Sequence, residues 1–322
     1  MKEDYKQTNI LLESGTNELE IVEFQITPPS ETNPDKKEGD FYGINVAKVR
    51  EIITMPVITE LPRAHPCVQG VFNLRGRVIP LIDLGHWIQQ KIRPEDEDTK
   101  KRVIVTEFNG IYNGFSVHSV SRIHRISWKQ VTSPSDIIED GGSDCIVGVI
   151  KFDNKIVMLL DFERIIADIN PSLTLKKVNP SKNESEKRHG KKILLAEDSN
   201  FIRKSVEESL TSAGYEVESF SNGEEAYRRI CAYEKNAKEN GYNITDLFQC
   251  LITDIEMPQM DGLHLTRRLR ESDFYKALPV IIYSSIANDE NKRKAAGVGA
   301  TGFIGKPELS KLVQLLDALI TR

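Results

Sequence analysis

The chain has 322 residues, of which 39% are hydrophobic and 28% are charged, and its net charge is −5. A slightly acidic chain gives no reason to expect a nucleic-acid-binding protein, and no apolar run approaches the ~20 residues that a membrane-spanning helix needs. The length suggests two or three domains.

The sequence shows no targeting signal and no cysteine motif. The first residues, MKEDYKQ, lack the apolar core of a signal peptide. The four cysteines lie far apart and form no Cys-x-x-Cys pair, so the sequence indicates neither a zinc site nor a disulfide framework. We therefore expect free thiols in a reducing cytoplasm, at Cys67, Cys145, Cys231 and Cys250.

Residues 18–169 have the pattern of β-strands. Val22, Phe24 and Ile26 alternate with polar residues, and long helical periodicity is scarce. The dipeptide Asn109-Gly110 is a strong hairpin signal. The sequence thus predicts an N-terminal tail over residues 1–17 followed by an all-β domain.

This β half also repeats itself. Residues 70–84 align without gaps with residues 148–162, and Gly, Val, Leu and Asp are identical at four matched places. Each copy reads as one hairpin. Two copies of one hairpin predict two similar β subdomains, each a small barrel.

Residues 170–190 read as a linker. The segment is polar, rich in lysine and punctuated by Pro171 and Pro180, so it cannot bury a core of its own. We expect the domain boundary here, with the second domain covering residues 191–322.

After the linker, short apolar runs alternate with helical segments. Five such units predict an α/β fold, a doubly wound five-stranded parallel sheet with helices on both faces. The strands are expected at 193–196, 215–220, 248–253, 280–283 and 301–304, and the helices near 200–212, 223–233, 263–270, 289–296 and 309–319.

Charged residues follow three of these strands. Glu197 and Asp198 follow the first, Asp254 follows the third, and Lys306 follows the fifth. In a parallel sheet, these side chains meet at the carboxyl edge, where open α/β sheets place their chemistry. Three crowded carboxylates repel one another unless a cation joins them, and a hard divalent ion with oxygen ligands is the natural partner.

The motifs of this half, LLAEDS, ITDIEMPQMDG and GATGFIGKP, resemble the receiver domain of two-component response regulators, a CheY- or flavodoxin-like fold. The resemblance implies that Asp254 is the phosphoacceptor, which attacks a phosphohistidine. It implies Mg²⁺ bound directly by Asp198, through water by Glu197, and by the backbone carbonyl of Glu256. Lys306 matches the lysine that neutralises the phosphoryl oxygens.

Ser284 and Phe303 look like the switch pair of such a domain. Ser284 ends a predicted strand, where its hydroxyl can donate to a new phosphoryl oxygen, and Phe303 would then turn inward. Ser285 is the competing hydroxyl. The register from the start of the strand favours Ser284.

The β half resembles the CheW adaptor of bacterial chemotaxis, through the motifs GVFNLRGRVIPLIDL and YGINVAKVREI. The resemblance implies two five-stranded SH3-like barrels, with chemoreceptors and the histidine kinase CheA as partners. Glu51 and Arg75 match positions that form an ion pair near the receptor groove, and Val49 and Gly70 match others on that surface.

The two halves in this order resemble the CheV family of chemotaxis coupling proteins. The resemblance implies an adaptor between receptors and kinase, regulated by phosphorylation and located in the cytoplasm at chemoreceptor arrays of the inner membrane. One alternative is a phosphate sink that drains CheA, and a less favoured one is a metal-dependent phosphatase. The sequence contains no Gly-rich nucleotide-binding loop, so we do not expect this chain to make its own phosphate donor.

Overall fold

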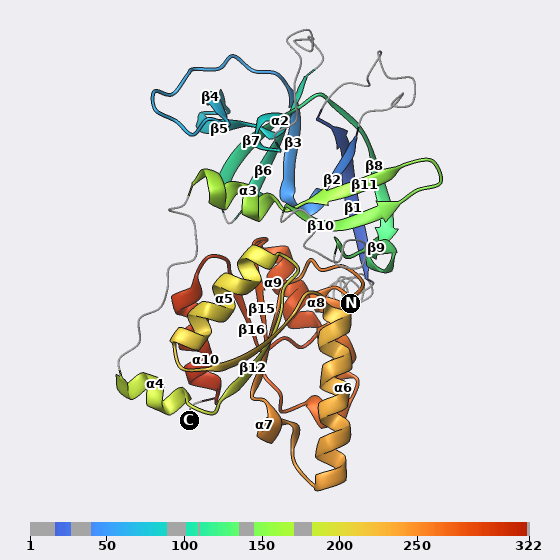
Figure 1. The fold of residues 1–322 in the computed structure, drawn as a ribbon, viewed down its shortest axis with the longest axis vertical. Coiled ribbons are helices and arrows are strands. Elements are labelled where there is room, and N and C mark those ends of the chain that lie inside the picture. Colours follow the sequence, from blue (N-terminus) through green and yellow to red (C-terminus); the bar gives the residue numbers. More distant parts are fainter. Residues whose placement is uncertain are drawn as a thin grey trace, which may run out of the picture. The chain divides into compact units, whose positions relative to one another are not determined.

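The structure is a computed structural model that describes residues 17–26, 40–88, 101–108, 110–134, 145–170 and 182–320. The chain divides into two compact units, made mainly of residues 19–171 and 172–322, and each is described by itself. Figure 1 shows the β-rich unit and the unit with helices around a central sheet. Among the described helices, none combines the length and the apolar character needed to cross a membrane.

The first unit contains two β-sheets, which agrees with the two predicted subdomains. Among the described residues the second sheet has six strands, one more than the resemblance implies, because the two-residue strand β9 pairs with β10 at its edge. One has the strand order β3-β6-β7-β5-β4 and the other has the order β8-β1-β2-β11-β10-β9. The first sheet consists of β3 (Val49–Thr54), β4 (Val68–Leu74), β5 (Arg77–Asp83), β6 (Arg102–Phe108) and β7 (Ile111–Val117). The second consists of β1 (Glu18–Gln25), β2 (Phe41–Asn45), β8 (Ser119–Ser127), β9 (Val131–Thr132), β10 (Ile146–Lys151) and β11 (Ile156–Leu160).

Short helices complete this unit. They are η1 (Val46–Lys48), α2 (Leu84–Trp87) and α3 (Phe162–Ile169), and the turn η3 (Trp128–Gln130) lies in the chain between β8 and β9. The hairpin predicted at Asn109-Gly110 is confirmed, because β6 and β7 pair antiparallel with Phe108 opposite Ile111. Asn109 itself lies outside the described residues.

The internal repeat is visible in three dimensions. The hairpin β4–β5 leads into α2 and the hairpin β10–β11 leads into α3, and an aspartate caps each helix. Asp83 accepts a hydrogen bond from the His86 N–H, and Asp161 accepts one from the Arg164 N–H, both at 3.0 Å. Aspartate at this position satisfies one of the unpaired N–H groups at a helix start.

The repeat does not follow the chain order of the strands. In the first sheet the hairpin β6–β7 lies beside β5, and in the second the hairpin β1–β2 takes the matching place beside β11. Both contacts are parallel, whereas the neighbouring pairs β6·β7 and β1·β2 are antiparallel. The second subdomain is therefore completed by strands from the beginning of the domain.

Helix α3 joins the two sheets. The ring of Phe162 packs edge-on against Phe115 of β7, with centroids 4.8 Å apart, and against Phe24 of β1 at 6.4 Å. All three rings are almost completely buried. Such aromatic contacts add to the stabilisation from burial alone.

A buried charge cluster lies inside the second sheet's subdomain. The carboxylate of Glu23, 1% exposed, accepts a hydrogen bond from Lys155 Nζ at 2.7 Å and lies 2.6 Å from His124 Nε2. Burial raises the pKa of Glu23, but the hydrogen bonds and charges of Lys155 and His124 outweigh it, so the pKa lies below its ordinary value of 4.5.

Replacing Lys155 by methionine is expected to lower the free energy of unfolding of this unit by ~3–5 kcal/mol at pH 7, because a buried carboxylate loses its cation. In the unchanged chain, the contribution of Glu23 is present above pH 4.5 and is lost as the pH falls through the lowered pKa of the folded state. The difference between the two proteins should therefore shrink in acid.

Urea unfolding followed by tryptophan fluorescence measures this effect, since Trp87 lies on α2 of this unit. Lys151→Met, at an exposed position on β10, is the matched control and should change stability little. Equal unfolding midpoints for Lys155→Met and the control would contradict the assignment.

The second unit confirms the predicted α/β fold. Its five strands are all parallel, in the order β13-β12-β14-β15-β16. They are β12 (Lys192–Ala196), β13 (Glu216–Phe220), β14 (Cys250–Thr253), β15 (Val280–Ser284) and β16 (Gly302–Gly305). The helices are α4 (Lys182–Arg188), α5 (Asn200–Ser212), α6 (Gly223–Asn240), α7 (Ile244–Leu247), α8 (Gly262–Arg270), η6 (Asp273–Tyr275), α9 (Asp289–Gly297) and α10 (Leu309–Ile320).

Successive residues of a strand point to opposite sides of the sheet. Because the strands here are apolar on both sides, helices cover both faces. On β12, Ile193 and Leu195 belong to the core under α5 and α10, whereas Leu194 and Ala196 belong to the core under α6 and α8. Helix α6 continues past residue 233 to Asn240, and its C-cap Gly241 has a φ of 72°. Glycine adopts this left-handed conformation without steric cost.

The end of the predicted linker forms α4, which packs on the second unit. Arg188, 3% exposed, donates to both carboxylate oxygens of Asp317 on α10, at 2.8 and 2.7 Å, and to the Ala213 carbonyl at 3.0 Å. The Tyr215 hydroxyl donates to the same carboxylate at 2.7 Å. A single arginine thus anchors a segment whose composition predicts no contact with a core.

Candidate functional site

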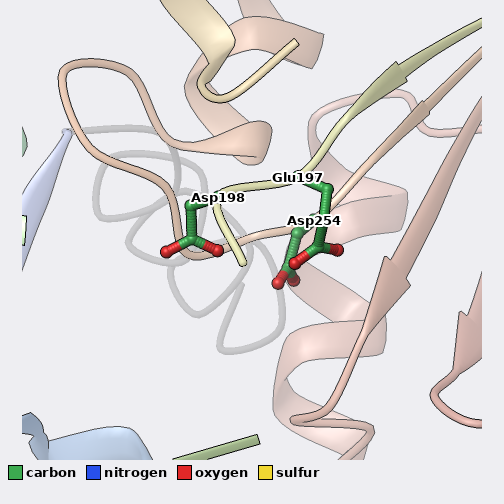
Figure 2. A group of neighbouring side chains, drawn as sticks. All are labelled: Glu197, Asp198 and Asp254. Atoms are coloured by element: carbon green, nitrogen blue, oxygen red, sulfur yellow. The ribbon is translucent and has the colours of Figure 1, made fainter. Parts of the chain in front are cut away.

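The predicted acidic residues converge at the carboxyl edge of the parallel sheet. Glu197 and Asp198 follow β12, and Asp254 follows the adjacent strand β14. Each of the three offers a carboxylate oxygen, and these oxygens lie within 4.8 Å of one another. Figure 2 shows the three side chains projecting from neighbouring strand ends.

Lys306 joins this group from β16. Its Nζ lies 2.7 Å from Asp254 Oδ2 and 2.8 Å from Glu197 Oε2. All three side chains are nearly inaccessible to solvent, with Lys306 4% exposed. A buried ammonium that contacts two buried carboxylates offsets their mutual repulsion.

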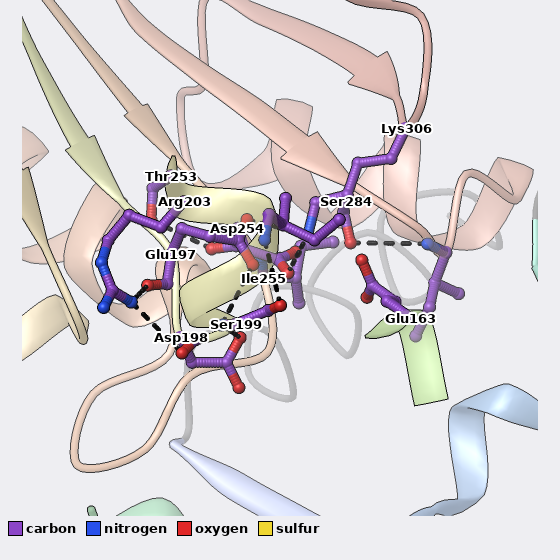
Figure 3. Close-up of polar contacts among 12 residues, drawn as sticks. Glu163, Glu197, Asp198, Ser199, Arg203, Thr253, Asp254, Ile255, Ser284 and Lys306 are labelled. Atoms are coloured by element: carbon purple, nitrogen blue, oxygen red, sulfur yellow. Dashed lines mark hydrogen bonds and ion pairs between the residues drawn. The ribbon is translucent and has the colours of Figure 1, made fainter. Parts of the chain in front are cut away.

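The backbone fixes the carboxylate of Asp254. The Ile255 N–H donates to Oδ1 at 2.6 Å, so Lys306 and this amide hold one oxygen each (Figure 3). Gly262 packs so closely here that a Cβ atom would lie 1.8 Å from the Asp254 carbonyl oxygen. The loop after β14 can therefore approach the start of α8 only because residue 262 lacks a side chain.

The loop after β12 is held just as firmly. Ser199 caps α5, accepting from the Ile202 N–H at 3.2 Å, and its own N–H donates to Asp198 Oδ1 at 2.9 Å. Arg203, in the first turns of α5, donates to the Glu197 carbonyl at 2.7 Å. Arg203 is not among the residues predicted from the sequence. Its signal was a basic residue on the predicted helix, five positions after Asp198.

The three carboxylates fit a hard divalent cation such as Mg²⁺, which prefers oxygen ligands and is usually bound through one or two carboxylates. Glu256, whose backbone carbonyl is the further predicted ligand, is 7% exposed and lies two residues after Asp254. The ligand set stays a prediction.

The predicted switch residues lie next to this site. Ser284 ends β15 and is fully buried, and its carbonyl accepts from the Lys306 N–H at 3.0 Å. Ser285 is also buried. Phe303 on β16 is half-buried against the cluster that includes Ile282. The roles of these residues stay predictions.

In the β unit, the structure brings together two of the four predicted partner-binding residues. Arg75 Nη2 donates to Glu51 Oε2 at 3.0 Å, and both line a cavity of about 290 Å³. The other residues lining this cavity are Arg50, Leu74, Arg77, Ile79 and Tyr112.

The other two predicted residues, Val49 and Gly70, are not among those that line this cavity. Gly70 has a φ of 148°, and a Cβ atom there would lie 2.4 Å from the Thr59 carbonyl oxygen. Close backbone packing is thus a sufficient reason for glycine at position 70.

Comparison with known protein families agrees with this two-part architecture. Residues 36–170 match the model of the CheW-like domain, and residues 193–317 match the model of the response regulator receiver domain. The first match begins after β1, and the second begins after α4 and ends within α10.

Relatives named as chemotaxis proteins match nearly the whole chain. The chain is 34% identical over 308 residues to the chemotaxis protein CheV3 of Helicobacter pylori, covering 95% of this chain and 96% of that protein. It is 28% identical to CheV2 of the same organism, covering 89% of this chain and 92% of the relative. Its first half is 27% identical to the chemotaxis protein CheW of Thermotoga maritima, covering 49% of this chain and 94% of that protein.

Proposed function

Because this chain belongs to the CheV family of chemotaxis proteins, we propose that it is a signalling adaptor controlled by phosphorylation. The CheW-like half couples chemoreceptors to the histidine kinase CheA, and the receiver half takes a phosphoryl group from that kinase at Asp254. The chain transmits a signal and catalyses no turnover of a free substrate.

One observation carries this proposal: Asp254 is buried, clamped by Lys306 and the Ile255 N–H, and surrounded by further carboxylates. In the transfer, an Asp254 oxygen forms a bond to phosphorus while the N–P bond of a phosphohistidine breaks. The electron pair of that bond stays on the imidazole nitrogen, which takes up a proton. Lys306 stabilises the charge on the transferred oxygens.

The residues around Asp254 are assigned supporting roles. Glu197, Asp198, Asp254 and the Glu256 carbonyl would hold Mg²⁺. When bound, the ion offsets the charges of the carboxylate and the phosphoryl group, which otherwise repel each other.

Phosphorylation adds ~1.5–2 negative charges at Asp254. Ser284, at the end of the adjacent strand β15, donates its hydroxyl to the new phosphoryl oxygens, and Phe303 then packs more deeply. The face formed by α9, β16 and α10 changes as a result.

The surface around the Glu51–Arg75 pair, with Val49 and Gly70, is the proposed receptor-binding region of the adaptor half. Exposed ion pairs contribute only ~0–1 kcal/mol to stability, so this pair serves recognition.

We propose the boundaries 1–17 for the tail, 18–169 for the adaptor, 170–190 for the linker and 191–322 for the receiver. The adaptor role implies a cytoplasmic protein recruited to receptor arrays at the inner membrane.

A reconstituted receptor–CheA assay tests the regulatory role. The full chain is added with and without beryllofluoride and Mg²⁺, which together mimic the phosphorylated state, and kinase activity is measured. We expect beryllofluoride to change the kinase activity through the unchanged chain and to have no effect through Asp254→Asn. Phosphate transfer without any change in coupling would instead indicate a phosphate sink.

A further inference from the structure

Arg203 binds the backbone of the acidic loop rather than its carboxylates. Its Nη1 donates to the Glu197 carbonyl at 2.7 Å and to the Asp198 carbonyl at 3.3 Å, and its Nη2 donates to Asn200 Oδ1 at 3.1 Å. Figure 3 shows the guanidinium beside the loop that carries both acids. One guanidinium nitrogen thus contacts both carbonyls while the other holds the Asn200 side chain, and a lysine ammonium does not reproduce this planar two-nitrogen arrangement.

We infer that Arg203 is a positioning residue: it sets the loop geometry that aims Glu197 and Asp198 at the metal site. This inference rests on the proposed phosphoacceptor function. Glu197 and Asp198 are consecutive, so a small rotation of the backbone between them moves both carboxylates. Partners that orient metal ligands in this indirect way typically change metal affinity by about 10–100-fold when removed.

Charge alone predicts the opposite sign. The positive charge of a guanidinium next to the acidic loop repels Mg²⁺. If charge were its only effect, removing the guanidinium would make metal binding tighter. A guanidinium that orients the ligands makes metal binding stronger, so its removal weakens binding. The direction of the change in Mg²⁺ affinity therefore separates positioning from charge.

The test is titration of the metal-free full chain with Mg²⁺ by calorimetry. We expect Arg203→Ala to weaken Mg²⁺ binding by at least about tenfold. Arg203→Lys keeps the charge but loses the fork, so it should also bind Mg²⁺ more weakly than the unchanged chain. Lys204→Ala removes an exposed cation from the neighbouring position and should leave the affinity within about twofold, because exposed charges are screened.

Urea unfolding of each variant in EDTA shows whether the variant is folded. If Arg203→Ala does not fold, the Mg²⁺ affinity of Arg203→Lys decides the test. Unchanged or tighter Mg²⁺ binding by the two Arg203 variants would overturn the inference while leaving the proposed function intact. Absence of Mg²⁺ binding by the unchanged chain would overturn the proposed metal site and the inference together.

Discussion

Asp254→Asn is expected to abolish transfer of a radiolabelled phosphoryl group from CheA to this chain. The amide replaces the nucleophilic carboxylate by a neutral group, and no covalent acyl phosphate can form on it. The shape of the side chain is kept, and the Ile255 N–H can still donate to the amide oxygen. The expected loss is therefore chemical, with the fold preserved.

Labelled CheA, this chain and Mg²⁺ are mixed, and the label on each protein is followed by gel electrophoresis. Asp273→Asn is the matched control, since Asp273 is an exposed aspartate in η6 of the same unit. The chain that carries this change should accept the label as the unchanged chain does. Treatment with hydroxylamine, which cleaves acyl phosphates, should release the label from the unchanged chain. Undiminished labelling of Asp254→Asn would exclude Asp254 as the phosphoacceptor.

Lys306→Met is expected to lower the free energy of unfolding of the receiver unit by ~3–5 kcal/mol in EDTA at pH 7. Methionine keeps much of the side-chain volume but removes the cation that contacts both Glu197 and Asp254. Because these two carboxylates are 1% and 2% exposed, solvent compensates little of their repulsion.

Mg²⁺ should restore part of that stability. An ion present at 100 times its Kd stabilises the folded state by ~2.7 kcal/mol, and it also replaces the missing positive charge. The loss caused by Lys306→Met should therefore be larger in EDTA than in saturating Mg²⁺. Urea unfolding followed by circular dichroism at 222 nm reports on this unit, which contains most of the described helices.

Lys311→Met provides the comparison for this variant. Lys311 lies on α10, is largely exposed and pairs with the exposed Glu308, so its replacement should cost no more than ~1 kcal/mol. Equal unfolding midpoints for the two variants in EDTA would show that the ammonium of Lys306 does not hold the buried carboxylates.

The parallel sheet was predictable because its pattern is local. Apolar runs of four to six residues alternate with helical segments, and helix α5 lies at the predicted residues 200–212. The acidic site was predictable for the same reason: once the strands are parallel, residues that follow them meet at one edge. The contact of Lys306 with Asp254 therefore follows from topology together with the order of the strands.

The strand arrangement of the β unit was only half predictable. The repeat of residues 70–84 and 148–162 predicts two similar subdomains, and the capped helices after Asp83 and Asp161 agree with it. The sequence does not reveal that β1 and β2 complete the second sheet. Pairing between strands more than a hundred residues apart depends on how the chain closes on itself, and local patterns do not encode it.

The two classes of fold, their order and the residues able to do the chemistry follow from local patterns in the chain, because periodicity and residue type act over short distances. The pairing of charged side chains depends on the folded state: Arg188 with Asp317, Arg203 with the carbonyls after β12, and Lys155 with Glu23. A charged side chain looks the same in a sequence whether it is solvated or buried. Its partner comes from a distant part of the chain, and that proximity arises only when the hydrophobic cores form.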